Sequence, residues 1–409
     1  MCAIASHNAD RVSGFKKIFI NFSHLAFGEF ASKAFGFLTS VYLARTLTVD
    51  QFGQYSWVMA VFAYLFLLGN FGFETYGVRT IANRSLKEVM NGILILRSAY
   101  VLILLTAVAA ANFLFFHKAN YLLVLQSASL TILPFNTQYI FRGLNKSRYD
   151  GFFRVSQAGL FFILVYWYVN SQRLLMIPVL WFIAAGCSSL IFWGIMTRTT
   201  PYKFSFPSFT IIKTVARDSL PIGIAGAIIL FYMNFDTVLL GLYTNSQSVG
   251  IYSAAFRIYF FGYALVGLFY IAFLPSLSNE NDRHSSVVHH HYVMSLLAAS
   301  FVVAVLGVLI SQPIIEMMFG HLYSEAIPVL KILFLSLAAG CINAAYLNPL
   351  QAVGNDTLFI KLLLLRTGVF IVLCFTLIPI YGIAGAAFST LIVEVVTVPF
   401  SVYCYNFRP

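Results

Sequence analysis

Charged side chains lie inside long apolar runs of this sequence, and two of them are placed as mirror images. Asp236 and Arg257 stand about ten residues on either side of Gln247, where a turn between two apolar runs is expected. In an antiparallel helix pair, a rise of about 1.5 Å per residue would put both at the same depth, roughly 15 Å from the turn. The spacing therefore predicts a buried ion pair between Asp236 and Arg257.

Arg366 and Glu394 show the same mirror relation around a turn expected at Ile380 and Tyr381. A charge at mid-bilayer costs at least about 2.5–3.5 kcal/mol on insertion scales, so each one needs a partner, a wet cavity or a function. Both mirrored pairs are open to two interpretations. They either hold helices together or form a site that binds a ligand or couples to protons.

Glu29 and Lys33 are four residues apart in the first apolar run, a spacing at which opposite charges pair on one helix. A structural pair and a role in a cavity both fit that spacing. Lys331 and Arg97 have no acidic residue at a matching depth. Unpaired cations inside a helical bundle favour an anionic ligand such as a phosphate. Arg97 lies only about five residues inside its run, so extension to the membrane interface is its alternative interpretation.

These residues form two candidate sets. The cationic binding candidates are Arg257, Lys331, Arg366, Arg97 and Lys33, and the ion-coupling or ion-pair candidates are Asp236, Glu394 and Glu29. Five cations inside apolar runs outnumber the acids at comparable depth, which favours an anionic ligand.

A stripe of tyrosines marks the run that carries Arg257. Tyr252, Tyr259, Tyr263 and Tyr270 are spaced by 7, 4 and 7 residues, which places them on one face of a helix. Arg257 lies roughly 140° around that helix, so the stripe and the cation cannot both face one narrow cavity. The tyrosine hydroxyl groups could line a path for sugars, but ordinary packing of the rings explains the stripe better.

The elements that position these residues are membrane-spanning helices. The 409 residues are 60% hydrophobic and 10% charged, with a mean hydropathy of +0.84, whereas soluble proteins carry roughly 25% charged residues. A span needs about 20 mostly apolar residues. Twelve spans are expected, at about 18–44, 53–76, 92–116, 120–141, 152–170, 174–196, 218–243, 250–275, 292–319, 324–350, 358–379 and 382–405. The first run is too long for a cleaved signal peptide and is expected to be retained as a span.

Basic residues between the runs predict the orientation. The net charge of +11 does not indicate nucleic-acid binding, because the basic residues lie between apolar runs and not on one polar face. With the N-terminus in the cytoplasm, cytoplasmic segments hold 17 basic residues and outer loops hold only Arg45, Lys118 and Arg173. The positive-inside rule therefore predicts that both termini are cytoplasmic.

Two segments repeat at an offset of 197 residues. Leu43, Gly53, Tyr55 and Ser56 in VYLARTLTVDQFGQYS match Leu240, Gly250, Tyr252 and Ser253 in TVLLGLYTNSQSVGIYS. Six spans precede the second copy, so both halves insert the same way up, related by an axis along the membrane normal. The repeat predicts two six-helix bundles, 1–205 and 206–409, which can rock about a central cavity; a duplicated scaffold that moves nothing is the alternative.

Common catalytic and metal-binding motifs are absent. The five cysteines are scattered without a CxxC, so no metal site or disulfide framework is expected. His289, His290 and His291 are interpreted as loop residues, because no further metal ligands accompany them. No P-loop, dinucleotide-binding glycine pattern, GxSxG or HExxH is present. No cofactor is expected, and an ion gradient or substrate flow would supply the energy.

Four stretches carry a resemblance to known proteins: 41–82, 220–258, FLPSLS (273–278) and IPIYGIAGAAFSTLIVEVV (378–396). They resemble the polysaccharide transporter family, whose best-known members are O-antigen flippases of the multidrug/oligosaccharidyl-lipid/polysaccharide exporter superfamily. It spans nearly the whole chain, as a diffuse hydrophobic pattern. Asp236 in NFDTVLLG and Arg257 in YSAAFRI fall within it.

The resemblance implies a fold and a cargo. The fold is an all-α membrane protein of about twelve helices in two bundles with a central cationic cavity. The cargo is an undecaprenyl-pyrophosphate-linked oligosaccharide, passed from the cytoplasmic to the periplasmic leaflet of a bacterial inner membrane. A proton or sodium gradient would drive transport, and the polysaccharide polymerase machinery would be a partner.

Three alternatives stay open. A multidrug exporter of the same superfamily usually takes cationic cargo, which a basic interior disfavours. A membrane enzyme such as a polymerase usually has a long outer loop, and the outer loops here are short. A lipid II flippase typically has fourteen spans, two more than expected here.

Overall fold

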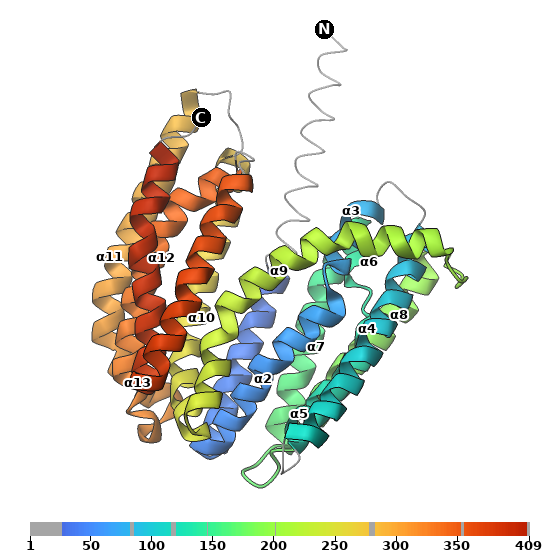
Figure 1. Cartoon of the computed structure of the whole chain (residues 1–409), viewed down its shortest axis with the longest axis horizontal. Helices are drawn as coiled ribbons and strands as arrows, with labels where there is room; N and C mark the ends of the chain where they lie inside the picture. The colour runs from blue at the N-terminus through green and yellow to red at the C-terminus, as the bar shows by residue number, and fades with distance from the viewer. Residues whose placement is uncertain are drawn as a thin grey trace. The chain divides into compact units, whose positions relative to one another are not determined.

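The computed structural model is helical, with no strand in the residues it describes, 27–81, 86–115, 120–144, 146–200, 202–277, 283–352 and 356–406 (Figure 1). Residues 27–46 form the first described helix. The following elements are α2 (Val49–Asn70), α3 (Phe73–Ile81), α4 (Leu86–Phe115), α5 (Tyr121–Ala128), η1 (Ser129–Phe135), α6 (Gln138–Gly143), α7 (Ser147–Tyr168), α8 (Met176–Thr199), α9 (Phe209–Tyr243), α10 (Ser246–Leu277), α11 (Arg283–Phe319), η2 (His321–Tyr323), α12 (Ala326–Ala352) and α13 (Asp356–Asn406).

Eight helical segments of the described residues are long and apolar enough to cross a membrane: Val49–Ile81, Leu86–Leu114, Met176–Thr199, Phe209–Tyr243, Ser246–Gly267, His289–Phe319, Ala326–Leu350 and Leu358–Tyr405. They overlap nine of the twelve expected spans, because the last segment covers two. The expected span 18–44 lies partly outside the described residues. The chain is thus an all-α, multi-pass membrane protein, and its count of twelve spans stays a prediction.

The last candidate segment folds back on itself. Gly382 has φ 55° and ψ −127°, a non-helical conformation that interrupts α13 and that residues with a side chain rarely adopt. Arg366 and Glu394 lie on opposite sides of Gly382 and form an ion pair. In a straight helix, 28 residues would span about 42 Å, so the ion pair requires a hairpin. The turn lies where the sequence predicts it.

The expected span 120–141 is not one continuous helix. It consists of α5, the 3₁₀ helix η1 with Pro134 inside it, and α6. Proline removes a backbone donor and disrupts the preceding turn of an α-helix. The expected span 152–170 corresponds to the later part of α7, whose first residues include Arg148, Asp150 and Arg154.

The chain divides into two compact units. Unit 1 contains Met1–Thr39 and Tyr64–Ala227, and unit 2 contains Ser40–Ala63 and Ile228–Pro409. In unit 1, α7 packs on α8, and α3 packs on α6. In unit 2, α12 packs against α10, α11 and α13 (Figure 1). The division at 205/206 stays a prediction.

The repeated segments meet inside unit 2, at the starts of α2 and α10. A Cβ added at Gly53 would clash with the carbonyl oxygen of Ser246, and one added at Gly250 would clash with that of Val49. Ser246 lies 197 residues after Val49, the same offset that relates Gly250 to Gly53. The two contacts are therefore reciprocal, as they are across a two-fold axis. Glycine allows the two backbones to come this close.

Candidate functional site

Arg257 lines a pocket of about 280 Å³ in unit 2. The pocket is bounded by α2, α9 and α10, and its lining includes Ser56, Asn234, Thr237 and Ser253 beside methionine and phenylalanine side chains. A cavity of this size admits several waters or one small polar group. The pocket thus combines a cation, an amide and three hydroxyl groups with an apolar wall.

No hydrogen bond or ion pair joins Arg257 to another residue in the described part of the chain. Its side chain is half-buried, and the phenol of Tyr55 lies within electrostatic range. A guanidinium carries five N–H donors and stays charged at physiological pH. Its donors are therefore free for a ligand in the pocket.

Asp236 does not pair with Arg257, so the predicted ion pair is wrong. The Asp236 carboxylate accepts hydrogen bonds from the Tyr252 hydroxyl, from the Thr237 backbone N–H at 2.6 Å and from the Thr237 hydroxyl at 3.2 Å. Its side chain is 1% exposed. Tyr252 and Arg257 are five residues apart on α10, which is about 140° around a helix. Equal depth did not bring the two charges together, because Asp236 on α9 bonds to the face of α10 that carries Tyr252, whereas Arg257 lies on another face of α10.

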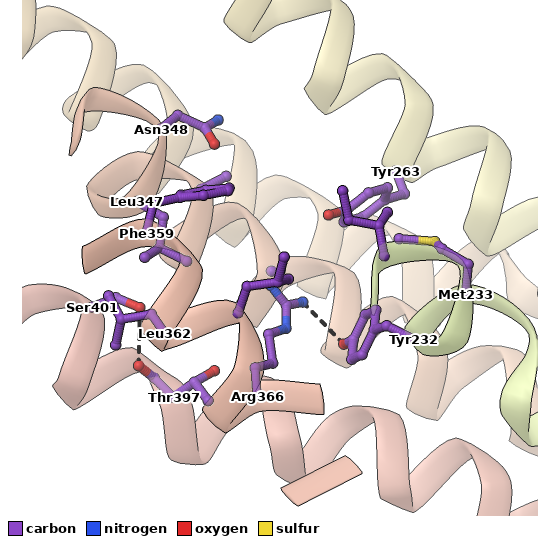
Figure 2. Close-up of a pocket in the computed structure, with 14 residues that line it drawn as sticks. Tyr232, Met233, Tyr263, Leu347, Asn348, Phe359, Leu362, Arg366, Thr397 and Ser401 are labelled. Carbon is purple, nitrogen blue, oxygen red and sulfur yellow. Dashed lines mark hydrogen bonds between the residues drawn. The ribbon is translucent and has the colours of Figure 1, made fainter. Parts of the chain in front are cut away.

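Arg366 lines a second pocket in unit 2, of about 170 Å³, shown in Figure 2. The Arg366 guanidinium pairs with Glu394, as the mirrored spacing predicts. It donates a hydrogen bond to the Tyr232 hydroxyl at 3.0 Å (Figure 2). That hydroxyl donates to Glu394 Oε1 at 2.9 Å. The guanidinium also lies 4.5 Å from the centroid of the Tyr232 ring. This cation is neutralised by the protein itself.

Asn343 and Ser401 complete the Glu394 site. The Asn343 side-chain amide donates to Glu394 Oε2 at 2.8 Å, and its oxygen accepts from the Ser401 hydroxyl at 2.9 Å. Glu394 and Asn343 are fully buried. Buried ionic groups are stable only when their remaining hydrogen-bonding capacity is satisfied. This network therefore holds α9, α12 and both arms of α13 together.

Lys331 lies outside both pockets. It is five residues from the start of α12, and its side chain is exposed. No ion pair of Lys331 is found within the described ranges. A long side chain near a helix end can extend its ammonium group to the membrane interface.

Glu29 and Lys33 pair within the first described helix, with 3.2 Å between Nζ and Oε1, as their spacing predicts. Glu29 also accepts an N–H from Arg154 at 3.0 Å. Arg154 lies 3.5 Å from Asp150, four residues earlier on α7. Within unit 1, Lys33 and Glu29 are thus the end of a longer charge network.

The network continues through Arg142 to Glu74. Arg142 lies 2.9 Å from Asp150 and 2.8 Å from Glu74. Burial lowers the pKa of the Arg142 guanidinium, but the neighbouring Glu74 and Asp150 carboxylates outweigh it, so its pKa is raised. Glu74 accepts a hydrogen bond from Asn70 at 3.1 Å. Asn70 in turn accepts one from Arg97.

Arg97 bonds to the protein through both terminal nitrogens of its guanidinium. It is fully buried. It donates to the carbonyl oxygens of Asn136 at 3.1 Å and Leu133 at 3.4 Å, and its guanidinium lies 5.1 Å from the Tyr139 ring. Neither interpretation from the sequence, an anionic ligand or extension to the interface, matches this environment. Arg97 fastens the irregular segment around η1 to α4.

Sequence reasoning missed several members of these networks: Glu74, Asp150, Arg142 and Arg154 in unit 1, and Tyr232 and Asn343 in unit 2. The spacing of Asp150 and Arg154 was a usable signal, because residues four apart pair on a helix. His289 to His291 also differ from expectation, since they lie within α11 and not in a loop. No cluster of histidine, cysteine and acidic side chains in the described segments could hold a metal ion.

Comparison with known protein families gives a match over more than half of the sequence. The family model described as "Polysaccharide biosynthesis protein" matches residues 18–279. No curated protein matches the sequence.

Solved transporter structures share the fold. The lipid II flippase MurJ in an inward closed conformation matches with a TM-score of 0.75 at 15% identity, over 94% of this chain and 88% of that one. A multidrug resistance MATE family transporter of the MOP superfamily matches in its outward-facing conformation with a TM-score of 0.64 at 16% identity, over 96% and 95% of the two chains. Its inward-facing conformation gives 0.71 at 14% identity, over 92% and 94%.

Proposed function

The chain belongs to the polysaccharide biosynthesis protein family. We propose that it is a flippase for a lipid-linked oligosaccharide. It moves undecaprenyl-pyrophosphate-linked O-antigen units from the cytoplasmic to the periplasmic leaflet of a bacterial inner membrane. The observation that carries the proposal is the unpaired Arg257 in the pocket between α2, α9 and α10.

The pocket suits the phosphate end of such a cargo. Arginine binds phosphate oxygens through parallel N–H donors, and such charge-assisted hydrogen bonds are about twice as strong as neutral ones. Ser56, Ser253 and Thr237 add hydroxyl groups around the same space. About 280 Å³ is enough for a phosphate group and too small for an oligosaccharide, so the sugars and the lipid tail would lie elsewhere.

Asp236 is the best candidate for ion coupling. Glu29 pairs with Lys33 and Arg154, and Glu394 pairs with Arg366. Asp236 has no cationic partner among the described residues, although it is buried. A buried carboxylate without a counter-charge favours binding of a proton or a small cation. Thr237 bonds to Asp236 and also lines the Arg257 pocket, which links the two sites.

The proposed mechanism is alternating access. Two six-helix halves, 1–205 and 206–409, rock so that the Arg257 pocket opens first to the cytoplasm and then to the periplasm. Both termini lie in the cytoplasm. Transport is coupled to a proton or sodium gradient. The polysaccharide polymerase machinery then receives the exported units.

A multidrug/cation antiporter is the second candidate, because a MATE transporter matches over 96% of this chain. Its usual cargo is cationic, and Arg257 would repel such a cargo. The two candidates predict different phenotypes after gene deletion. A flippase deletion removes surface polysaccharide and accumulates lipid-linked units inside, whereas an antiporter deletion raises drug sensitivity and leaves the polysaccharide intact.

The proposal is tested by returning variants to the deletion strain. Arg257→Ala is expected to lower surface polysaccharide by roughly tenfold or more, the factor expected from losing a charge-assisted contact of about 1.5–3 kcal/mol. Arg257→Lys should retain part of the activity. Lys361→Ala is the matched control, because Lys361 is an exposed cation of unit 2 that lines neither pocket. Full activity of Arg257→Ala at a normal protein level would refute the anionic site.

A further inference from the structure

Two of the three walls of the Arg257 pocket come from the internal repeat. Six of the lining residues form three pairs separated by 197 residues, the offset of the internal repeat: Ser56 with Ser253, Met59 with Phe256, and Ala60 with Arg257. One member of each pair lies on α2 and the other on α10. The pocket is therefore lined by equivalent positions of the two repeats.

The helix crossing explains why equivalent positions meet. Gly53 and Gly250 pack backbone to backbone with reciprocal contacts. Positions 60 and 257 each follow their glycine by seven residues, which is close to two full turns. They therefore lie on the face of the helix that carries the crossing, and at equal distances from it. Three equivalent positions of each helix line the pocket, and α10 adds Phe260.

One of the three pairs breaks the symmetry of charge. Serine is matched with serine, and methionine with phenylalanine, so these pairs keep the chemical character of the wall. Ala60 is matched with Arg257, so only one wall carries a cation. Ala60 is 4% exposed and contributes a methyl group to the pocket. The third wall, from α9, has no counterpart among the lining residues.

We propose that position 60 is the second, vacant half of the anion site and determines how many phosphate groups the pocket holds. The inference rests on the proposed function and deepens it. With alanine at 60, the pocket grips one phosphate group of a diphosphate. With arginine at 60 as well, two guanidinium groups on opposite walls would bind both phosphates, and release of the diphosphate would slow. An arginine at 60 alone would replace Arg257.

Alanine at position 60 leaves the pocket with a single cation, which favours release of the ligand. A transported ligand has to bind well enough to enter and weakly enough to leave. Each additional bidentate contact between arginine and phosphate strengthens binding. A diphosphate held by two cations would leave the pocket slowly, so a single cation suits a transporter better than a pair.

The test compares four full-length proteins: wild type, Arg257→Ala, Ala60→Arg, and the transposed variant Arg257→Ala/Ala60→Arg. Each is purified in detergent, and binding of inorganic pyrophosphate and inorganic phosphate is measured by titration. Surface polysaccharide is measured in the deletion strain at matched protein level. Val61→Arg combined with Arg257→Ala is the control, because Val61 neighbours Ala60 on α2 but does not line the pocket.

The transposed variant is expected to regain pyrophosphate binding and at least about half of wild-type polysaccharide, while the Val61→Arg control stays inactive. Ala60→Arg alone should bind pyrophosphate roughly tenfold more tightly than wild type, with little change for phosphate, and should transport more slowly. If arginine at 60 lowers the protein level, Arg257→Ala/Ala60→Lys takes its place in the same comparison.

The outcomes separate this inference from the proposed function. Loss of binding in Arg257→Ala without any recovery in a folded transposed variant would overturn the equivalence of positions 60 and 257 and leave the flippase proposal standing. Unchanged pyrophosphate binding in Arg257→Ala would overturn both. Equal recovery with arginine at 61 would overturn the inference as well, because it would mean that any nearby cation suffices.

Discussion

Gly53 and Gly250 lie against each other, backbone to backbone, at the crossing of α2 and α10. A Cβ added at Gly53 would lie 2.8 Å from the Gly250 nitrogen, and one added at Gly250 would lie 3.2 Å from the Gly53 nitrogen. Both glycines belong to the internal repeat, at an offset of 197 residues. The repeat is thus a contact in the structure as well as a pattern in the sequence.

The crossing predicts that an added methyl group destabilises the fold. Gly53→Ala and Gly250→Ala should each cost about 1–3 kcal/mol, the range for overpacking a close contact, and Gly53→Ala should cost more because its Cβ would clash more deeply. Thermal unfolding in detergent measures the effect. Gly267→Ala is the control, since nothing lies within 4 Å of a Cβ at that α10 position. Equal melting temperatures for all three variants would contradict the tight crossing.

The buried pair of Arg366 and Glu394 predicts strong non-additivity. Arg366→Leu or Glu394→Leu alone should destabilise by about 3–5 kcal/mol, because each leaves an uncompensated buried charge. The double variant should be less destabilised than either single variant, since two apolar side chains replace two charges. A double-mutant cycle on unfolding free energies checks this. Additive losses would mean that the two side chains act independently.

Replacing Asp236 is expected to impair coupling to the ion gradient without impairing pyrophosphate binding. Asp236→Asn keeps the size of the side chain and removes its ability to exchange a proton. Pyrophosphate binding to the purified variant should be close to wild type, while transport into proteoliposomes should lose its dependence on an imposed gradient. Tyr252→Phe removes a hydrogen bond to Asp236 and keeps the carboxylate, so it should retain gradient dependence. Gradient-driven transport by Asp236→Asn would exclude Asp236 as the coupling group.

The buried hydrogen bonds of Arg97 predict that its replacement impairs folding and not transport. Arg97→Ala removes three hydrogen bonds and leaves the acceptors at Asn70, Leu133 and Asn136 without that partner. An unsatisfied buried polar group costs about 1–3 kcal/mol, so the amount of folded protein should fall. Transport per folded molecule should stay normal, measured as polysaccharide divided by monodisperse protein. Loss of transport at a normal protein level would instead indicate that Arg97 binds the ligand.

Composition and spacing were sufficient for the parts of this protein that depend on one helix or one hairpin. The scarcity of charges requires a lipid environment, and the apolar runs predict most of the helices. Glu29 with Lys33 and Arg366 with Glu394 were predictable, because a helix turn or a hairpin fixes which residues share a height. The break of 120–141 into α5, η1 and α6 was not predicted, although Pro134 was a visible signal.

Contacts among several helices needed the folded structure. The spacing along a hairpin predicts that Asp236 and Arg257 lie at the same depth. The direction in which each side chain points depends on how α9, α10 and α2 pack, and in this packing the two side chains do not face each other. Arg97 looked unpaired because its acceptors carry no charge: they are two backbone carbonyls of a distant irregular segment and the side-chain oxygen of Asn70, which no charge pattern reveals. The sequence shows that Ala60 and Arg257 are equivalent, while the crossing at Gly53 and Gly250 is what puts them on opposite walls of one pocket.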